Sequence, residues 1–167
     1  MSVLLGPSTI DLKDELQLAL NRHKYTADID YYEGEENLVG VLDRVLENSD
    51  AMLSIADPAI FNTENARNIL LTAYHWRIPL IGLSPAYVRA GALAAVYTSY
   101  TQLATQVAET IESLRSCSSI KQIQPQYPKY FDVIVNYQVA EAIGVVVDSQ
   151  ERLRSKLGPI HTKVKPE

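Results

Sequence analysis

Apolar residues along this 167-residue chain follow two alternating patterns. Short runs rich in apolar or β-branched residues have the length of strands, and longer stretches repeat apolar residues every three or four positions, as one buried helix face requires. The predicted strands are residues 3–5, 26–32, 51–56, 79–83, 93–97 and 131–135. The predicted helices are residues 12–22, 35–46, 62–77, 86–90, 99–115, 137–143 and 152–157.

Turn formers separate these segments. Gly6-Pro7 follows the first predicted strand, Gly91 ends a short helix, and Gly144 ends the helix at 137–143. Strands that alternate with helices along the whole chain favour parallel pairing, with helices on both faces of the sheet. The sequence therefore predicts a three-layer α/β/α fold, Rossmann-like or flavodoxin-like, with a mainly parallel sheet of about five to six strands.

Charge and composition narrow the classes of partner. The formal net charge is −5, and the densest basic group lies in a polar C-terminal tail, residues 148–167. Nucleic acid is not expected as a partner, because phosphate binding needs clustered Lys and Arg. No stretch reaches the roughly 20 apolar residues of a membrane span. The first residues lack the basic and apolar regions of a signal peptide, and the one cysteine, Cys117, excludes an intrachain disulfide.

Candidate ligand contacts lie in the loops that follow the predicted strands. Ligands of open parallel sheets bind beyond the carboxyl ends of the strands. The loops at that edge are residues 6–9, 57–62, 84–87 and 97–99. Within them, the side chains that we expect to bind a ligand are Ser8, Asp57, Phe61, Asn62, Ser84 and Tyr87.

Two of these interpretations have a structural alternative. The carboxylate of Asp57 either pairs with an amine of a ligand or accepts hydrogen bonds from its own turn ahead of Pro58. Phe61 and Tyr87 either enclose a flat or apolar ligand or only cover the sheet.

Enzymatic chemistry has little support in the sequence. No G-x-G-x-x-G, Walker A, H-x-x-H, C-x-x-C or G-x-S-x-G motif occurs. None of the histidines, His23, His75 and His161, lies in a predicted strand-end loop. We therefore expect no catalytic residue, no metal and no cofactor.

Several segments resemble one bacterial family, the ABC-transporter substrate-binding proteins. The first is Asp50-Ala51-Met52-Leu53-Ser54-Ile55-Ala56-Asp57-Pro58-Ala59-Ile60-Phe61-Asn62. Further segments are Arg77 to Ser84, Ala86 to Tyr97, and Pro125 to Phe131 with Val135-Asn136 and Gln138-Val139-Ala140. They occur in the family's order and spacing, and the resemblance covers about residues 1–147.

The resemblance implies a lobe of a type I periplasmic binding protein, in which two α/β lobes close on a small solute and deliver it to an ABC permease. Residues 1–147 then correspond to the second lobe, and residues 99–136 to a crossover segment between lobes. The contacts implied on this side of the cleft are Asp57, Phe61, Asn62, Ser84 and Tyr87. The family more usually has an Asp-Asn pair where this chain has Asp57-Pro58, so the resemblance alone does not assign an amino acid as the solute.

The length of the chain leaves further readings open. Family members are about twice as long and begin with a secretion signal. The resemblance implies a periplasmic location, whereas a complete gene product without a signal would be cytoplasmic. One alternative function is a cytosolic ligand-sensing or protein-interaction module, and a small enzyme is the least favoured. A lone lobe would also expose the apolar face of the helix at 99–115, so a homodimer is a further expectation.

Overall fold

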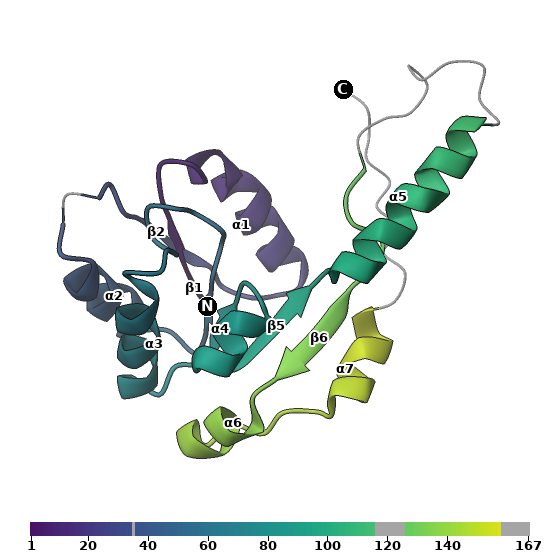
Figure 1. The fold of residues 1–167 in the computed structure, drawn as a ribbon. Helices are drawn as coiled ribbons and strands as arrows, with labels where there is room; N and C mark the ends of the chain where they lie inside the picture. The colour runs from purple at the N-terminus through teal and green to yellow at the C-terminus, as the bar shows by residue number, and fades with distance from the viewer. Residues whose placement is uncertain (35, 116–125, 158–167) are drawn as a thin grey trace. The chain divides into compact units, whose positions relative to one another are not determined.

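A computed structural model of the chain describes residues 1–34, 36–115 and 126–157 (Figure 1). Cys117 and the end of the predicted polar tail lie outside these residues.

The sheet of the described residues has six strands in the order β2-β1-β3-β4-β5-β6. Neighbouring strands from β2 to β5 are parallel, with Ser2 opposite Met52 and Met52 opposite Leu80. The arrows of β5 and β6 point in opposite directions in Figure 1. The strands are β1 Ser2–Leu5, β2 Asp28–Tyr31, β3 Met52–Leu53, β4 Leu80–Gly82, β5 Ala94–Tyr97 and β6 Asp132–Val135. This mainly parallel sheet confirms the predicted fold class.

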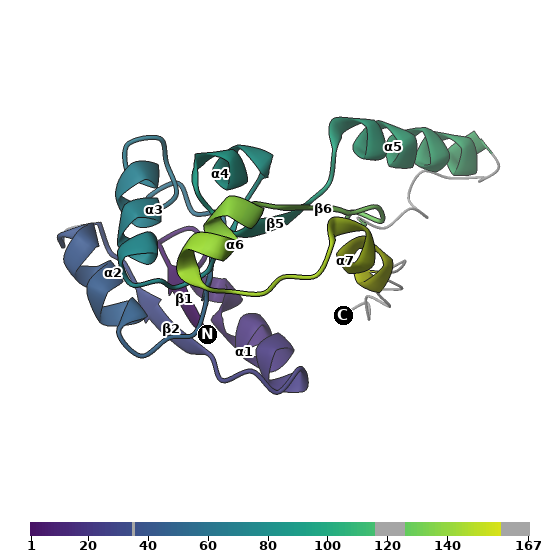
Figure 2. The ribbon, with the colours of Figure 1, turned by 90° about the horizontal axis from the view of Figure 1, so that it is seen from below.

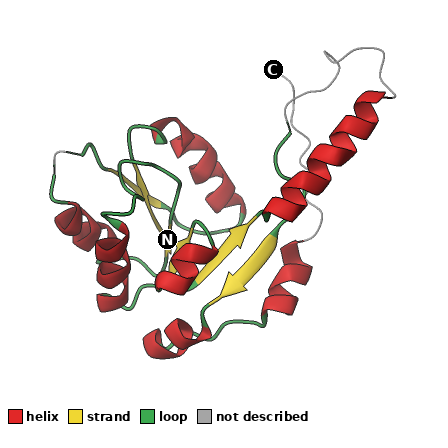
Figure 3. Cartoon of the chain, in the orientation of Figure 1, coloured by secondary structure: helices red, strands yellow, loops and turns green. Residues whose placement is uncertain are grey.

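Helices follow the strands in regular alternation, as the periodicity predicts (Figures 1 and 3). Side-chain caps fix several of their first turns. Asn37 Oδ1 accepts a bond from Val39 N at the start of α2, and Asn136 Oδ1 accepts one from Val139 N at the start of α6. The helices are a short 3₁₀ turn at Ile10–Leu12, α1 Lys13–Arg22, α2 Leu38–Leu46, α3 Ala66–His75, α4 Pro85–Ala90, α5 Tyr100–Arg115, α6 Tyr137–Ile143 and α7 Gln150–Leu157.

The main hydrophobic core lies between the sheet and the layer of α2, α3 and α4, whose helices stand close together in Figure 2. Leu42, Leu46, Met52 and Ile69 are fully buried there. Burying a side chain of this size contributes about 1.5–3 kcal/mol. The core therefore holds the ends of β1, β3 and β4 in fixed positions relative to α3 and α4, which is the region of the expected ligand contacts.

The chain divides into two compact units. The first contains residues 1–95 and 134–147, and the second contains residues 96–133 and 148–167. Within the second unit, Thr98 Oγ1 donates to Tyr130 O at 3.0 Å, and Arg154 forms an ion pair with Asp132. The segment that the resemblance assigns to a crossing between lobes, residues 99–136, falls largely in this second unit.

The long helix α5 contains no buried residue, although Leu103, Val107 and Ile111 repeat along it at helical spacing. Each of these side chains is about half exposed. An amphipathic helix gains most of its stability from tertiary packing of its apolar face. The apolar face of α5 therefore remains available for a contact outside the described residues.

Candidate functional site

The loops after β1, β3 and β4 lie at one edge of the sheet, because these three strands are adjacent and parallel. Side-chain contacts join the loops. Ser8 N donates to Asp57 Oδ2 at 2.9 Å, and the rings of Phe61 and Tyr87 pack edge to face with their centroids 6.4 Å apart. The structure thus places the sequence-predicted residues in two neighbouring groups, one around Asp57 and one around the aromatic pair.

Asp57 serves the fold of this edge. Its side chain is 1% exposed, and its Oδ2 atom accepts a second bond from Thr9 Oγ1 at 2.9 Å. Its Oδ1 atom accepts a bond from Ala59 N at 2.9 Å. These three donors satisfy the hydrogen-bonding capacity of a side chain that is buried from solvent. Its own turn ahead of Pro58 thus supplies one of these bonds, through Ala59 N, and the loop after β1 supplies the other two.

Gly6 is required beside this carboxylate. A Cβ atom built on Gly6 would lie 2.6–2.8 Å from the carboxyl atoms of Asp57. Gly6 N also donates to Thr9 Oγ1 at 3.0 Å. Gly6, Thr9 and Asp57 therefore form a close-packed cluster that connects the loops after β1 and β3. The sequence does not reveal Thr9 as a member, because only the folded chain brings its hydroxyl to Asp57.

Asn62 and Ser84 also organise the loops in which they lie. Asn62 Nδ2 donates to Pro58 O at 3.0 Å, and its Oδ1 atom accepts a bond from Asn65 N at 2.9 Å. Ser84 caps α4, and its Oγ atom accepts a bond from Tyr87 N at 3.5 Å. The bonds of both side chains fix the backbone on which Phe61 and Tyr87 stand.

A hollow of about 320 Å³ opens between the start of α3 and α4. Its walls are mostly apolar, and Phe61 in it is only 9% exposed. The lining residues are Phe61, Asn62, Thr63, Ala66, Leu70, Ala86, Tyr87 and Ala90. The hollow is at the lower end of the size range of small-molecule sites. Of the six sequence-predicted residues, it brings together Phe61, Asn62 and Tyr87.

The hydroxyl of Tyr87 is the polar feature of this aromatic pair. Tyr87 Oη is buried and has no hydrogen-bond partner among the described residues, and Ser54 Oγ, just beyond β3, is in the same condition. Burial raises the pKa of the Tyr87 hydroxyl, so this group stays protonated and can donate a hydrogen bond. Unpaired buried hydroxyls are uncommon because they lose solvation without compensation.

The fourth predicted loop lies at the start of α5, in the second unit. Ser99 N donates to Gln102 Oε1 at 2.8 Å, and Gln102 N donates to Ser99 Oγ at 3.2 Å. This reciprocal pair is a capping box, which fixes where α5 begins.

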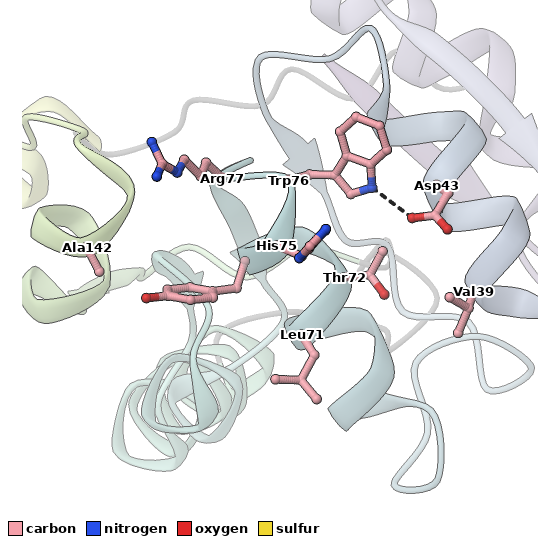
Figure 4. A pocket seen from close by; sticks show the side chains of 9 residues that line it. Val39, Asp43, Leu71, Thr72, His75, Trp76, Arg77 and Ala142 are labelled. Carbon is pink, nitrogen blue, oxygen red and sulfur yellow. Dashed lines mark hydrogen bonds between the residues drawn. The ribbon is translucent and has the colours of Figure 1, made fainter.

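A second hollow, of about 870 Å³, lies on the outer side of α2 and α3, away from the predicted contacts (Figure 4). Trp76 Nε1 donates to Asp43 Oδ1 at 2.7 Å across it. Its lining residues are Val39, Asp43, Leu71, Thr72, Tyr74, His75, Trp76, Arg77 and Ala142. Sequence periodicity places Leu71 and Tyr74 on the exposed side of α3 but gives no sign that they gather with Trp76.

The described ranges contain neither a cluster of metal-binding side chains nor a membrane-spanning helix. Residues 1–34, 36–115 and 126–157 contain no group of three His, Cys, Asp or Glu side chains placed to hold a metal ion. Within the same ranges, every helix is too short or too polar to cross a lipid bilayer.

Comparison with family models matches residues 20–156 to the family described as ABC transporter substrate binding protein. The match covers most of the chain, so the chain belongs to this family. The family consists of binding proteins, and membership confirms the expectation that the chain is not an enzyme. Comparison with curated protein sequences finds no match.

Solved structures share the fold at low sequence identity. A conserved domain protein from Vibrio cholerae is 19% identical, with a TM-score of 0.68 over 92% of this chain and 52% of that one. The ligand-free, open form of CD0873, a substrate binding protein with adhesive properties from Clostridium difficile, is 19% identical, with a TM-score of 0.69 over 90% and 51%. An ABC domain in complex with L-Trp from Streptococcus pneumoniae is 13% identical, with a TM-score of 0.67 over 92% and 52%. The chain thus spans about half the length of these structures.

Proposed function

We propose that this chain supplies one side of a solute-binding cleft in an ABC import system. In this proposal the chain acts outside the cytoplasm and delivers its solute to an ABC permease. The observation that carries this proposal is the apolar hollow lined by the packed rings of Phe61 and Tyr87, at the carboxyl edge of a parallel sheet. Membership of the substrate-binding family supports the same function.

The solute in this proposal is a small organic molecule with an apolar body, and amino acids are the first candidates to test. The hollow has no charged side chain among its lining residues. Tyr87 Oη offers one buried donor, so a solute with an acceptor beside its apolar part would satisfy it. Asp57 already accepts bonds from Ser8 N, Thr9 Oγ1 and Ala59 N, so the amine of an amino acid would find its partner elsewhere.

The opposite wall of the cleft would come from a further lobe. The solved relatives are about twice as long as this chain, and the apolar face of α5 has no buried residue. A lobe packed on α5 would cover Leu103, Val107 and Ile111.

Thermal unfolding in the presence of single amino acids tests the proposed solute site. A ligand at ten times its dissociation constant stabilises the native state by about 1.4 kcal/mol, which corresponds to a rise of roughly 3–6 °C in Tm for a chain of this size. We expect at least one amino acid with an apolar side chain to give such a rise, and Tyr87→Ala to abolish it.

The matched control is Tyr25→Ala, because Tyr25 is exposed and lies outside the hollow. This variant should keep the full rise in Tm. A solute that stabilises Tyr87→Ala as much as the unchanged chain would place its site elsewhere and contradict the proposal.

A further inference from the structure

The second hollow carries the largest apolar side chains on the outer surface of α2 and α3. Val39, Leu71, Tyr74 and Trp76 are 36–55% exposed and line one continuous depression, which we call the α2–α3 face. Scattered exposed apolar residues are ordinary, but a contiguous set on one surface marks a contact with another protein. The α2–α3 face lies entirely in the first unit of the chain.

A hydrogen bond holds the ring of Trp76 in one orientation. Its indole N–H donates to Asp43 Oδ1 at 2.7 Å, which fixes the ring between the two helices (Figure 4). Side chains of Trp, Tyr and Arg dominate the energetics of protein interfaces, and the α2–α3 face contains one of each. A fixed aromatic ring loses little conformational freedom when a partner covers it.

Charges of opposite sign lie at the two ends of this face. Arg77 lies at the end where α3 stops, next to Trp76. Glu33 and Glu36 precede α2 at the end marked by Val39. No ion pair joins Arg77 or Glu33 to another described residue, whereas Glu36 lies 3.7 Å from Arg44. A two-fold axis through the middle of the face would bring the basic end of one copy onto the acidic end of the other.

The backbone of Arg77 adopts an unusual conformation at the end of α3. Arg77 has φ of 56°, a left-handed conformation that glycine commonly adopts where a helix ends. Arg77 N donates to Tyr74 O and Ile78 N donates to Ala73 O, which closes the end of α3 in this geometry. Figure 4 shows the guanidinium group extended away from the ring of Trp76. A long cationic side chain thus occupies a position where glycine would relieve backbone strain.

We propose that the α2–α3 face binds a second copy of this chain in a two-fold symmetric dimer. Val39, Leu71, Tyr74 and Trp76 form the apolar centre, and Arg77 of each copy pairs with the acidic residues before α2 of the other. The same patch meets itself in such an interface, so its two charged ends must be complementary, as they are here.

Sedimentation equilibrium of the full chain over a range of concentrations tests this proposal. We expect reversible dimer formation in the micromolar range, as is usual for an interface of limited area. Leu71→Glu should raise the dissociation constant at least about tenfold, because it places a charge in the apolar centre. Leu18→Glu, on the equally exposed Leu18 of α1, is the matched control and should leave the constant unchanged.

A charge exchange tests the orientation of the two copies. Arg77→Glu should weaken the dimer at least about tenfold, and combining it with Glu33→Lys and Glu36→Lys should restore the constant to within about threefold. Arg77→Gly separates assembly from folding, since it should raise Tm of the dilute monomer while weakening the dimer. A change in Tm alone would mean that Arg77 has only a structural role and would overturn the proposed ion pairs.

Two outcomes would overturn the dimer itself. One is a chain that stays monomeric at all concentrations. The other is a dimer that survives Leu71→Glu but is lost on Leu103→Glu, because the contact would then belong to the apolar face of α5.

Discussion

At the scale of single residues, the edge of the sheet is organised by one buried carboxylate. Asp57 connects the loop after β1 to the loop after β3 through Ser8 N, Thr9 Oγ1 and Ala59 N. The sequence predicts that Asp57 lies at this edge, because it follows a short apolar run directly. It does not reveal that two of the bonds come from Ser8 and Thr9, because these donors are nearly fifty positions away in the chain.

We expect Asp57→Ala to lower the free energy of unfolding by about 2–4 kcal/mol, because it leaves buried donors at Ser8, Thr9 and Ala59 without an acceptor. Gly6→Ala should cost about 1–3 kcal/mol, because its new Cβ atom meets the carboxyl group. Urea unfolding of both variants measures these costs.

The double variant Gly6→Ala/Asp57→Ala shows whether the two residues are in direct contact or destabilise the chain independently. With Asp57 truncated, the Cβ atom at position 6 has room, so the double variant should be less destabilised than the sum of the single changes. Simple addition of the two costs would contradict a direct contact between Gly6 and Asp57.

A second residue-scale prediction concerns the second unit. Lys129 and Tyr130 bond to the Glu109 carboxylate and hold its pKa below the ordinary value, while Glu109 raises the pKa of Lys129. A carboxyl group with a lowered pKa in the folded state stabilises that state above its unfolded pKa, and the stabilisation is lost as pH falls through the folded pKa. We expect Lys129→Ala to raise the pKa of Glu109 in an NMR titration. An unchanged pKa would show that the Lys129–Glu109 pair is absent in solution.

At the scale of elements, hydrophobic periodicity predicts the alternation of strands and helices. It does not predict whether the apolar face of each helix is buried by the rest of the chain. The stripe of α2 is fully buried at Val41, Leu42 and Leu46, whereas the similar stripe of α5 is exposed. Period alone cannot distinguish these two helices, because it reports which face is apolar and not what lies against it. The α2–α3 face escapes sequence reasoning for the same reason.

For the third strand, the sequence predicts a longer element than the structure contains. An apolar run over residues 51–56 predicts a long strand, whereas β3 covers only Met52–Leu53. Ser54 N still donates to Ile81 O, but the chain then turns toward the bonds of Asp57. Apolar composition extends into the loop here because the loop is itself packed at the edge of the sheet.

Hydrogen exchange should separate the two helices clearly. In the chain as given, we expect the amides of α5 to exchange faster than those of α2 by at least about a hundredfold, since few buried contacts oppose the opening of α5. Equal protection of α5 and α2 would mean that α5 is covered, either by a second copy or by part of this chain.

At the scale of the whole molecule, the chain is a member of the ABC transporter substrate binding protein family that spans about half of its solved structural relatives. Its two compact units differ in how well they are packed. The first has a buried core and both hollows, whereas α5 of the second has no buried residue. The two proposed roles follow from this difference. We propose that the first unit binds the solute and that the second contacts a further lobe.

The central claim is that solute binds in the hollow lined by Phe61 and Tyr87. Amide chemical-shift mapping of the labelled chain tests it most directly, because NMR also detects the weak binding expected of half a cleft. During titration with each amino acid in turn, we expect at least one to shift the amides of residues 57–62 and 84–87 and to leave residues 71–77 unchanged. No shift at these loops with any amino acid, or shifts confined to residues 71–77, would contradict the claim.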